Sequence, residues 1–159
     1  MEQQNYEQRG YLHEDFRLFH LEEAMTAPVD WHYHTFHKII AFLSGSASYG
    51  IEGKSYVLEA GGLILVPSGC IHRPEIAPGA PYERIILYIS PEFLRTAGTP
   101  DCDLEACFAK AQAEFMFVLR PGAERRALLG ALLALEREQP SQAFGRALLE
   151  RALVLQFLI

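Results

Sequence analysis

Up to about residue 90, the chain alternates short apolar runs with clusters of turn residues such as SGSA, EGK, EAGG and PSGC. This alternation is typical of β-strands joined by tight turns. Strands are predicted over Phe16–Leu21, His32–Leu43, Ala47–Ile51, Lys54–Leu58, Leu63–Val66, Ile71–Ile76 and Tyr82–Ile89. Because short strands must not leave long edges exposed, we expect them to close into a small antiparallel β-barrel or to pack as a β-sandwich.

After residue 90 the pattern becomes helical. Ser90 followed by proline predicts a capped helix over Pro91–Ala97. A second helix is predicted over Asp103–Ala111, and the apolar run Phe115–Leu119 predicts an edge strand.

From Pro121 the chain is rich in Ala, Leu, Arg and Glu, which favours two helices. Pro121 opens the first, Gln139-Pro140 closes it and Ser141 caps the second. The short break predicts an antiparallel helical hairpin. Leucines recur on one face of each segment: Leu128, Leu132 and Leu135 in the first, Leu148 and Leu155 in the second. These stripes either pack on the barrel or bury their excess in a second subunit as a dimerisation surface.

Length and charge narrow the class of protein. A chain of 159 residues, half of them hydrophobic, is the size of one globular domain. Fourteen Lys and Arg against 20 Asp and Glu give a net charge of −6, which disfavours direct binding of nucleic acid. No apolar run is long enough to span a membrane and the N-terminus lacks a signal peptide, so a cytoplasmic protein is expected. Cys70, Cys102 and Cys107 form no paired motif and are expected to be small buried hydrophobes.

Histidines gather at two places in the predicted strands. His32, His34 and Lys38 stand at even spacings, which puts them on one face of an extended strand, with His37 on the other. A turn containing Pro and Gly precedes His72 and can return it to the same interior face. The sequence therefore predicts a cluster of imidazoles beside one lysine inside the barrel.

The spacings H-x-H-x3-K-x6-G, beginning at His32, and G-x5-P-x-G-x2-H, ending at His72, resemble the two signature motifs of the cupin superfamily. Three positions depart from those motifs. The family's glutamate ligand falls on Lys38, the asparagine that often closes the second motif falls on Ile76, and Gly62 replaces a common aspartate.

Within the cupins, the sequence from Trp31 to about Phe93 most resembles the effector-binding and dimerisation domain of AraC-type transcription regulators. The resemblance rests on two segments, HYHTFHKIIAFLSGSASYGIEGKSYVLEAGGLILVPSGCIHRP and PYERIILYISPEFL. It implies an effector-binding barrel over residues 1–120 with an N-terminal arm (residues 1–13), and a dimerising hairpin over 121–159. It also implies a DNA-binding helix-turn-helix domain of roughly a hundred residues beyond 159. The apolar ending without a capping signal predicts that the chain is cut from a longer protein.

The interior side chains suggest the kind of ligand. Arg84 and Tyr88 share a face of the last long strand and add donors to the predicted ligand-binding set of His32, His34, Lys38, His72, Arg84 and Tyr88. Such a cavity favours a carboxylate, a phosphate or a hydroxyl-rich sugar. His32, His34 and His72 are also a candidate site for Zn, Ni or Fe, although an ammonium at Lys38 opposes a cation, so no cofactor is required.

The predicted function is therefore that of a ligand-sensing regulator domain and not of an enzyme. Its expected partners are a small polar effector, a second copy of the chain, and DNA only through the further domain, with no membrane. A small metal-dependent cupin enzyme, such as a dioxygenase or isomerase, is the alternative. A stand-alone binding or storage-type cupin is a third possibility.

Overall fold

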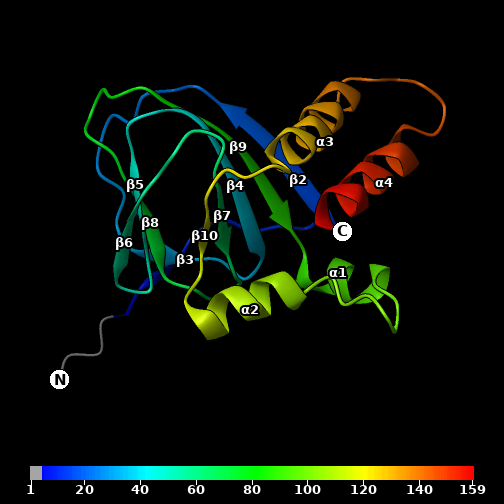
Figure 1. Ribbon diagram of the computed structural model, residues 1–159, viewed down its shortest axis with the longest axis horizontal. Helices are drawn as coiled ribbons and strands as arrows, with labels where there is room; N and C mark the ends of the chain where they lie inside the picture. Colours follow the sequence, from blue (N-terminus) through cyan, green and yellow to red (C-terminus); the bar gives the residue numbers. More distant parts are fainter. Residues whose placement is uncertain (1–4) are drawn as a thin grey trace.

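The computed structural model describes residues 5–159, which are mostly β-structure in two five-stranded sheets together with four helices (Figure 1). The first sheet has the order β1 (Glu7–Gln8), β3 (His32–Tyr33), β8 (His72–Glu75), β5 (Ser48–Ile51) and β6 (Lys54–Val57). The second sheet has the order β10 (Val118–Leu119), β7 (Leu63–Val66), β4 (His37–Gly45), β9 (Tyr82–Ile89) and β2 (Phe16–Leu21). All pairings are antiparallel except that of β1 with β3.

The expected closed barrel does not form. Within residues 5–159, no strand of one sheet pairs with a strand of the other, so the strands make two separate layers. The reason lies in the predicted strand His32–Leu43, which is broken into β3 and β4. The chain leaves the first sheet after β3 and enters the second at His37, so the break is where it crosses between layers.

The turn after β7 holds this crossing segment in place. Gly69 has φ +84°, a left-handed conformation that glycine adopts without a Cβ penalty. Its N–H donates to the carbonyl of His34 at 2.8 Å, and the neighbouring N–H of Ser68 donates to Nδ1 of His37 at 3.0 Å. The turn therefore occupies the His34 carbonyl, which would otherwise be free to extend the ladder of β3.

Two predicted features at the strand ends match the structure. The EGK sequence forms a two-residue hairpin turn between β5 and β6, with Glu52 and Gly53 both at positive φ (49° and 81°). The run Phe115–Leu119 contains the predicted edge strand as β10, which pairs with β7.

The helices begin later than the capping signals predicted, except for α1 (Pro91–Ala97), where the Ser90 hydroxyl accepts the N–H of Phe93 at 3.4 Å. The other helices are α2 (Ala106–Glu114), α3 (Arg125–Glu138) and α4 (Arg146–Leu158). Ser141 does not cap α4; its hydroxyl accepts the N–H of Ala143 in the preceding loop, and Gly145 occupies the N-cap position. In the described part of the chain, no helix has the length and apolar character needed to cross a bilayer.

The helices cover the outer face of the second sheet. His37 points to this face, as predicted, and its ring stacks on Phe108 of α2 with centroids 4.1 Å apart. Helices α3 and α4 pack on each other and on the same side of the sheet (Figure 1). Leu132 and Leu135 are buried in the chain's own core.

Burial of those two leucines revises the predicted dimerisation set. Leu132 and Leu135 are already covered by their own chain, and Leu128 and Leu155 are half-buried against the core, whereas Leu148 is 71% exposed. An amphipathic stripe cannot tell these two uses of leucine apart, because both place apolar residues at the same helical spacing.

The three cysteines are free, and only one of them fits the expectation of burial. Cys70 is buried, Cys102 is half-buried and Cys107 is exposed on α2. The predicted N-terminal arm, residues 1–13, is described from residue 5 onward, and its first four residues lie outside the described part.

Candidate functional site

Three histidines meet between the two sheets. His32 on β3 pairs directly with His72 on β8, and His34 follows on the crossing segment. The ring centroids lie 4.5 Å apart for His32 and His72, 4.7 Å for His34 and His72, and 5.1 Å for His32 and His34. All three side chains are buried, and one nitrogen from each lies within 4.8 Å of the others. The predicted convergence of these residues therefore occurs, although one of them is not in a strand.

Backbone carbonyls fix the tautomer of each ring. Each Nδ1 lies against a backbone oxygen: His32 against Asp30 (2.8 Å), His34 against Arg9, and His72 against Cys70 (2.9 Å). Because a carbonyl oxygen only accepts, each Nδ1 carries the proton and each Nε2 keeps its lone pair. The Nε2 atoms of His34 and His72 are buried and have no hydrogen-bond partner. His34 and His72 thus present lone pairs inside the cluster that no group among residues 5–159 satisfies.

Burial keeps these rings neutral. It lowers the pKa of His34 to about 4 and that of His72 to about 2, and it also lowers the pKa of His32. The positive charge of Lys38 lowers all three further.

Lys38 faces the cluster from the opposite sheet. Its side chain on β4 is buried, and its Nζ donates to the hydroxyl of Tyr49 on β5 at 3.3 Å. Burial, and then the charge of Arg84, lower the pKa of Lys38 from 10.5 to about 8. Tyr49 is a site residue that the sequence reasoning missed, although its place in the strand Ala47–Ile51 was predicted.

Arg84 and Tyr88 share the inner face of β9, as predicted. The Arg84 guanidinium is buried, donates to the carbonyls of Glu23 (3.1 Å) and Tyr82 (2.9 Å), and lies 4.2 Å from the centre of the Tyr82 ring. The half-buried Tyr88 packs its ring on Phe36, with centroids 4.4 Å apart. Nη1 of Arg84 thus ties β9 to the segment after β2, while the other N–H groups of the guanidinium form no hydrogen bond within residues 5–159.

The donor set fits a metal ion in one respect and departs from the cupin pattern in another. Three converging Nε2 lone pairs, each oriented by a hydrogen bond from Nδ1 to a carbonyl, are the arrangement that Zn²⁺ or Fe²⁺ takes from protein imidazoles. The position expected for a carboxylate ligand holds Lys38, whose ammonium form repels a cation. The three rings are therefore sufficient ligands only when Lys38 is neutral or faces an anion.

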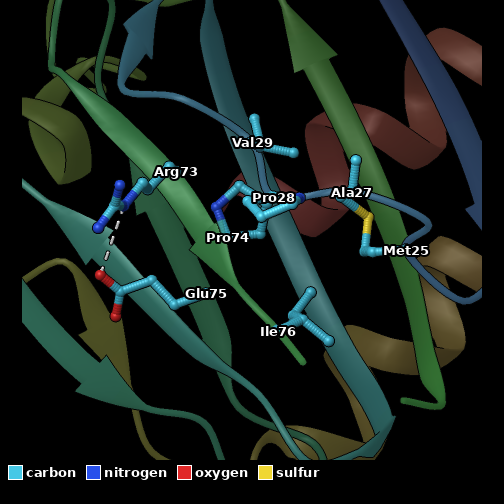
Figure 2. Close-up of a pocket in the computed structure, with 8 residues that line it drawn as sticks. All are labelled: Met25, Ala27, Pro28, Val29, Arg73, Pro74, Glu75 and Ile76. Atoms are coloured by element: carbon cyan, nitrogen blue, oxygen red, sulfur yellow. Dashed lines mark ion pairs between the residues drawn. The ribbon is translucent and has the colours of Figure 1, made fainter. Parts of the chain in front are cut away.

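An open pocket of about 240 Å³ lies along β8, the strand that carries His72. Its lining is formed by Met25, Ala27, Pro28, Val29, Arg73, Pro74, Glu75 and Ile76 (Figure 2). Arg73 and Glu75 form an ion pair with 3.6 Å between Nε and Oε1, on the side of the pocket away from Met25 and Ala27. None of the predicted site residues lines it, but Pro74 shares a face of β8 with His72 because side chains alternate along a strand.

Comparison with known proteins gives one family. The model of the AraC-like ligand binding domain matches residues 19–158. No curated protein sequence is significantly similar to the chain. The solved structures that resemble parts of it include the following three.

A cupin-like protein of Thermotoga maritima is 20% identical, with 50% of this chain and 60% of that chain covered and a TM-score of 0.44. A Cupin 2 conserved barrel domain protein of Salinispora arenicola is 15% identical, with 54% and 71% covered and a TM-score of 0.44. The polyketide cyclase RemF of Streptomyces resistomycificus is 23% identical, with 46% and 54% covered and a TM-score of 0.39. The family match extends over both sheets and all four helices, apart from β1 and the start of β2. The chain belongs to the family of AraC-like ligand-binding domains.

Proposed function

We propose that this chain is the effector-binding and dimerisation domain of a cytoplasmic AraC-type transcription regulator, and that it binds a small anionic molecule between its two sheets. The bound effector controls DNA binding by a helix-turn-helix domain that follows the described chain. The domain itself has no catalytic role.

Two buried cations without a counter-ion carry this proposal. Lys38 and Arg84 are each 7% exposed and face the same interior from β4 and β9. Neither forms an ion pair with a carboxylate among residues 5–159. Buried charges are normally paired because desolvation is costly, so a carboxylate or phosphate on the effector supplies the missing partner. The neutral imidazoles then act as acceptors for its hydroxyl groups.

A pocket gives the effector a way into the space between the sheets, and the N-terminal arm covers the bound effector. The pocket along β8 (Figure 2) is lined by Pro74, which alternation places on the same face of the strand as His72, and it provides the way in. The described part of the N-terminal arm contacts the cluster at Arg9, whose carbonyl accepts from His34 and whose N–H donates to the Tyr33 carbonyl at 2.9 Å. An effector that binds the ordered arm better than the free arm shifts the domain toward the ordered state.

The exposed apolar residues of the C-terminal helical pair form the proposed dimer surface. Phe144, Leu148 and Leu149 are 107%, 71% and 44% exposed, and all three lie at or near the N-terminal half of α4. Exposed apolar side chains so closely grouped favour burial against a second copy. This surface replaces Leu132 and Leu135 of the predicted set.

A thermal-shift screen tests the proposal. Wild-type protein is melted with small carboxylic acids, sugar phosphates and neutral sugars, beside the variants Lys38→Met and Lys110→Met. Lys110 is an exposed lysine of α2 and serves as the matched control. An anionic compound is expected to raise the Tm of the wild type and of Lys110→Met but not of Lys38→Met. A ligand that raises the Tm of all three proteins equally refutes binding at Lys38.

A small metal-dependent cupin enzyme is the second candidate, favoured by the three converging Nε2 atoms alone. His32, His34 and His72 would hold the metal, which would act as a Lewis acid on an oxygen of the substrate. Metal analysis of protein purified without chelator and without a nickel column distinguishes the two. One equivalent of iron or zinc that is lost in His72→Asn would support a metal centre, whereas metal-free protein that still responds to an anion supports the regulator.

A further inference from the structure

A second cluster of titratable groups lies outside the candidate site, where the second sheet meets the C-terminal helices. His20 of β2 lies between two carboxylates, with its Nδ1 2.7 Å from Glu136 of α3 and its Nε2 2.9 Å from Glu83 of β9. All three side chains are partly shielded, at 22%, 34% and 30% exposed for His20, Glu136 and Glu83. One imidazole thus connects a helix to two strands.

The chemistry of the ring decides what this arrangement requires. A neutral imidazole has a single N–H, so it donates to one carboxylate and turns a lone pair toward the other. Only the imidazolium ion donates to both at once. The two short contacts therefore belong to the protonated ring, and loss of the proton replaces one ion pair with a repulsion between a lone pair and a carboxylate.

The charged groups recorded around His20 are carboxylates. Besides Glu83 and Glu136, Glu22 lies just after β2, and an oxygen of its carboxylate lies within 4.8 Å of both the ring and the Glu83 carboxylate. The Ser44 hydroxyl of β4 donates to the second oxygen of Glu83 at 3.1 Å and fixes it. No lysine or arginine pairs with Glu83 or Glu136 among residues 5–159, so the charge that joins them comes from His20. Within residues 5–159, the other side-chain hydrogen bond from the end of α3 to β2 runs from the amide of Gln139, the residue after the helix, to the Leu18 carbonyl at 3.4 Å.

We propose that Glu83, His20 and Glu136 form a proton-dependent latch that fixes α3, and with it the C-terminal helical pair, on the second sheet. The latch is closed while His20 is protonated and weakens when it is not. Hydrogen bonds to both carboxylates offset the burial of the ring and raise its pKa above 6.5, so the change falls above the range of an isolated histidine. None of its tests uses an effector, so the latch stands or fails independently of the proposed function.

The sign of the effect follows from linkage. A group whose pKa is higher in the folded state than in the unfolded chain stabilises the fold fully below the unfolded value, here 6.5. That contribution is lost as the pH rises through the folded value. The latch is therefore closed in mildly acidic solution and opens in alkaline solution.

Two conservative variants separate the latch from ordinary packing. Glu136→Gln removes one carboxylate and keeps the size of the side chain, while Glu138→Gln changes a carboxylate of the same helix that has no side-chain partner in the described structure. The imidazole of His20 is titrated by NMR in each protein, in buffer containing a chelator. The midpoint is expected above 6.5 in the wild type and in Glu138→Gln, and closer to 6.5 in Glu136→Gln.

Amide exchange of α3, corrected for the intrinsic effect of pH, gives the structural readout. Protection of α3 is expected to fall in the wild type as the pH rises through the His20 midpoint. Protection in Glu136→Gln is expected to be lower at acidic pH and to change little. A wild-type midpoint at or below 6.5, or equal α3 protection in wild type and Glu136→Gln at every pH, overturns the latch. If Glu136→Gln does not fold, Glu83→Gln at the other end of the ring provides the same comparison.

Discussion

Replacing Lys38 with methionine is expected to stabilise the ligand-free domain. The fall in the Lys38 pKa from 10.5 to about 8 corresponds to about 3 kcal/mol of disfavoured charge at any pH below 8. Methionine fills a similar volume without that charge, while the lost hydrogen bond to Tyr49 costs about 1 kcal/mol. The net gain at pH 7 is about 2 kcal/mol, or roughly 4–8 °C in Tm for a domain of this size.

The pH dependence of this gain is the decisive part. Because the folded pKa of Lys38 lies below its unfolded value, the wild type recovers stability as the pH rises from about 8 to 10.5. The advantage of Lys38→Met should shrink across that window. Thermal and urea unfolding from pH 7 to 10.5, with chelator present and Lys110→Met as the control, measure it. A Lys38→Met protein less stable than the wild type at pH 7, or an advantage that does not change with pH, would refute the reasoning.

Three further changes test other parts of the account. Leu148 is exposed, so Leu148→Asp should convert a dimer into a monomer by analytical ultracentrifugation and change the free energy of unfolding by less than about 0.5 kcal/mol. Leu132 is buried, so Leu132→Asp should lower the free energy of unfolding by more than about 3 kcal/mol. Deletion of residues 1–13 should weaken binding of an effector found in the screen about tenfold by calorimetry, or about 1.4 kcal/mol; unchanged affinity would exclude the arm as a cover. Gly50→Ala should cost about 1–3 kcal/mol in urea unfolding, since its new Cβ would lie 2.6 Å from the Trp31 ring, and an unchanged midpoint would show that the ring moves freely.

The histidine site shows how far the sequence reaches. Alternation along one long strand correctly put His32, His34 and Lys38 toward a common interior, but the strand does not exist as one piece. The residues still converge because the chain crosses from one sheet to the other. His32 and Lys38 therefore face each other from opposite sheets. Alternation records the direction of a side chain and not the sheet to which its strand belongs.

Other features depended on contacts that no local pattern contains. The Nδ1 atoms are fixed by carbonyls from distant segments, including that of Arg9, and a carbonyl is present at every residue. The latch joins His20 to Glu83 and Glu136, which lie 63 and 116 residues further along the chain. No local pattern therefore distinguished His20 from an ordinary surface histidine. The leucine stripe of α3 correctly predicted that Leu132 and Leu135 are buried. That they are buried in the chain's own core, and not against a second copy, followed only from the packing of the whole chain.

The central claim is that Lys38 is a buried amine whose counter-ion is supplied by the anionic effector. An NMR titration of the lysine side-chain nitrogens tests this claim most directly. The chain contains only Lys38, Lys54 and Lys110, so each resonance can be assigned with one substitution. Without effector, Lys38 should titrate near pH 8, and an anionic effector should move its midpoint upward, since an opposite charge favours the ammonium. A Lys38 resonance that titrates near 10.5 and does not respond to any anion would contradict the account.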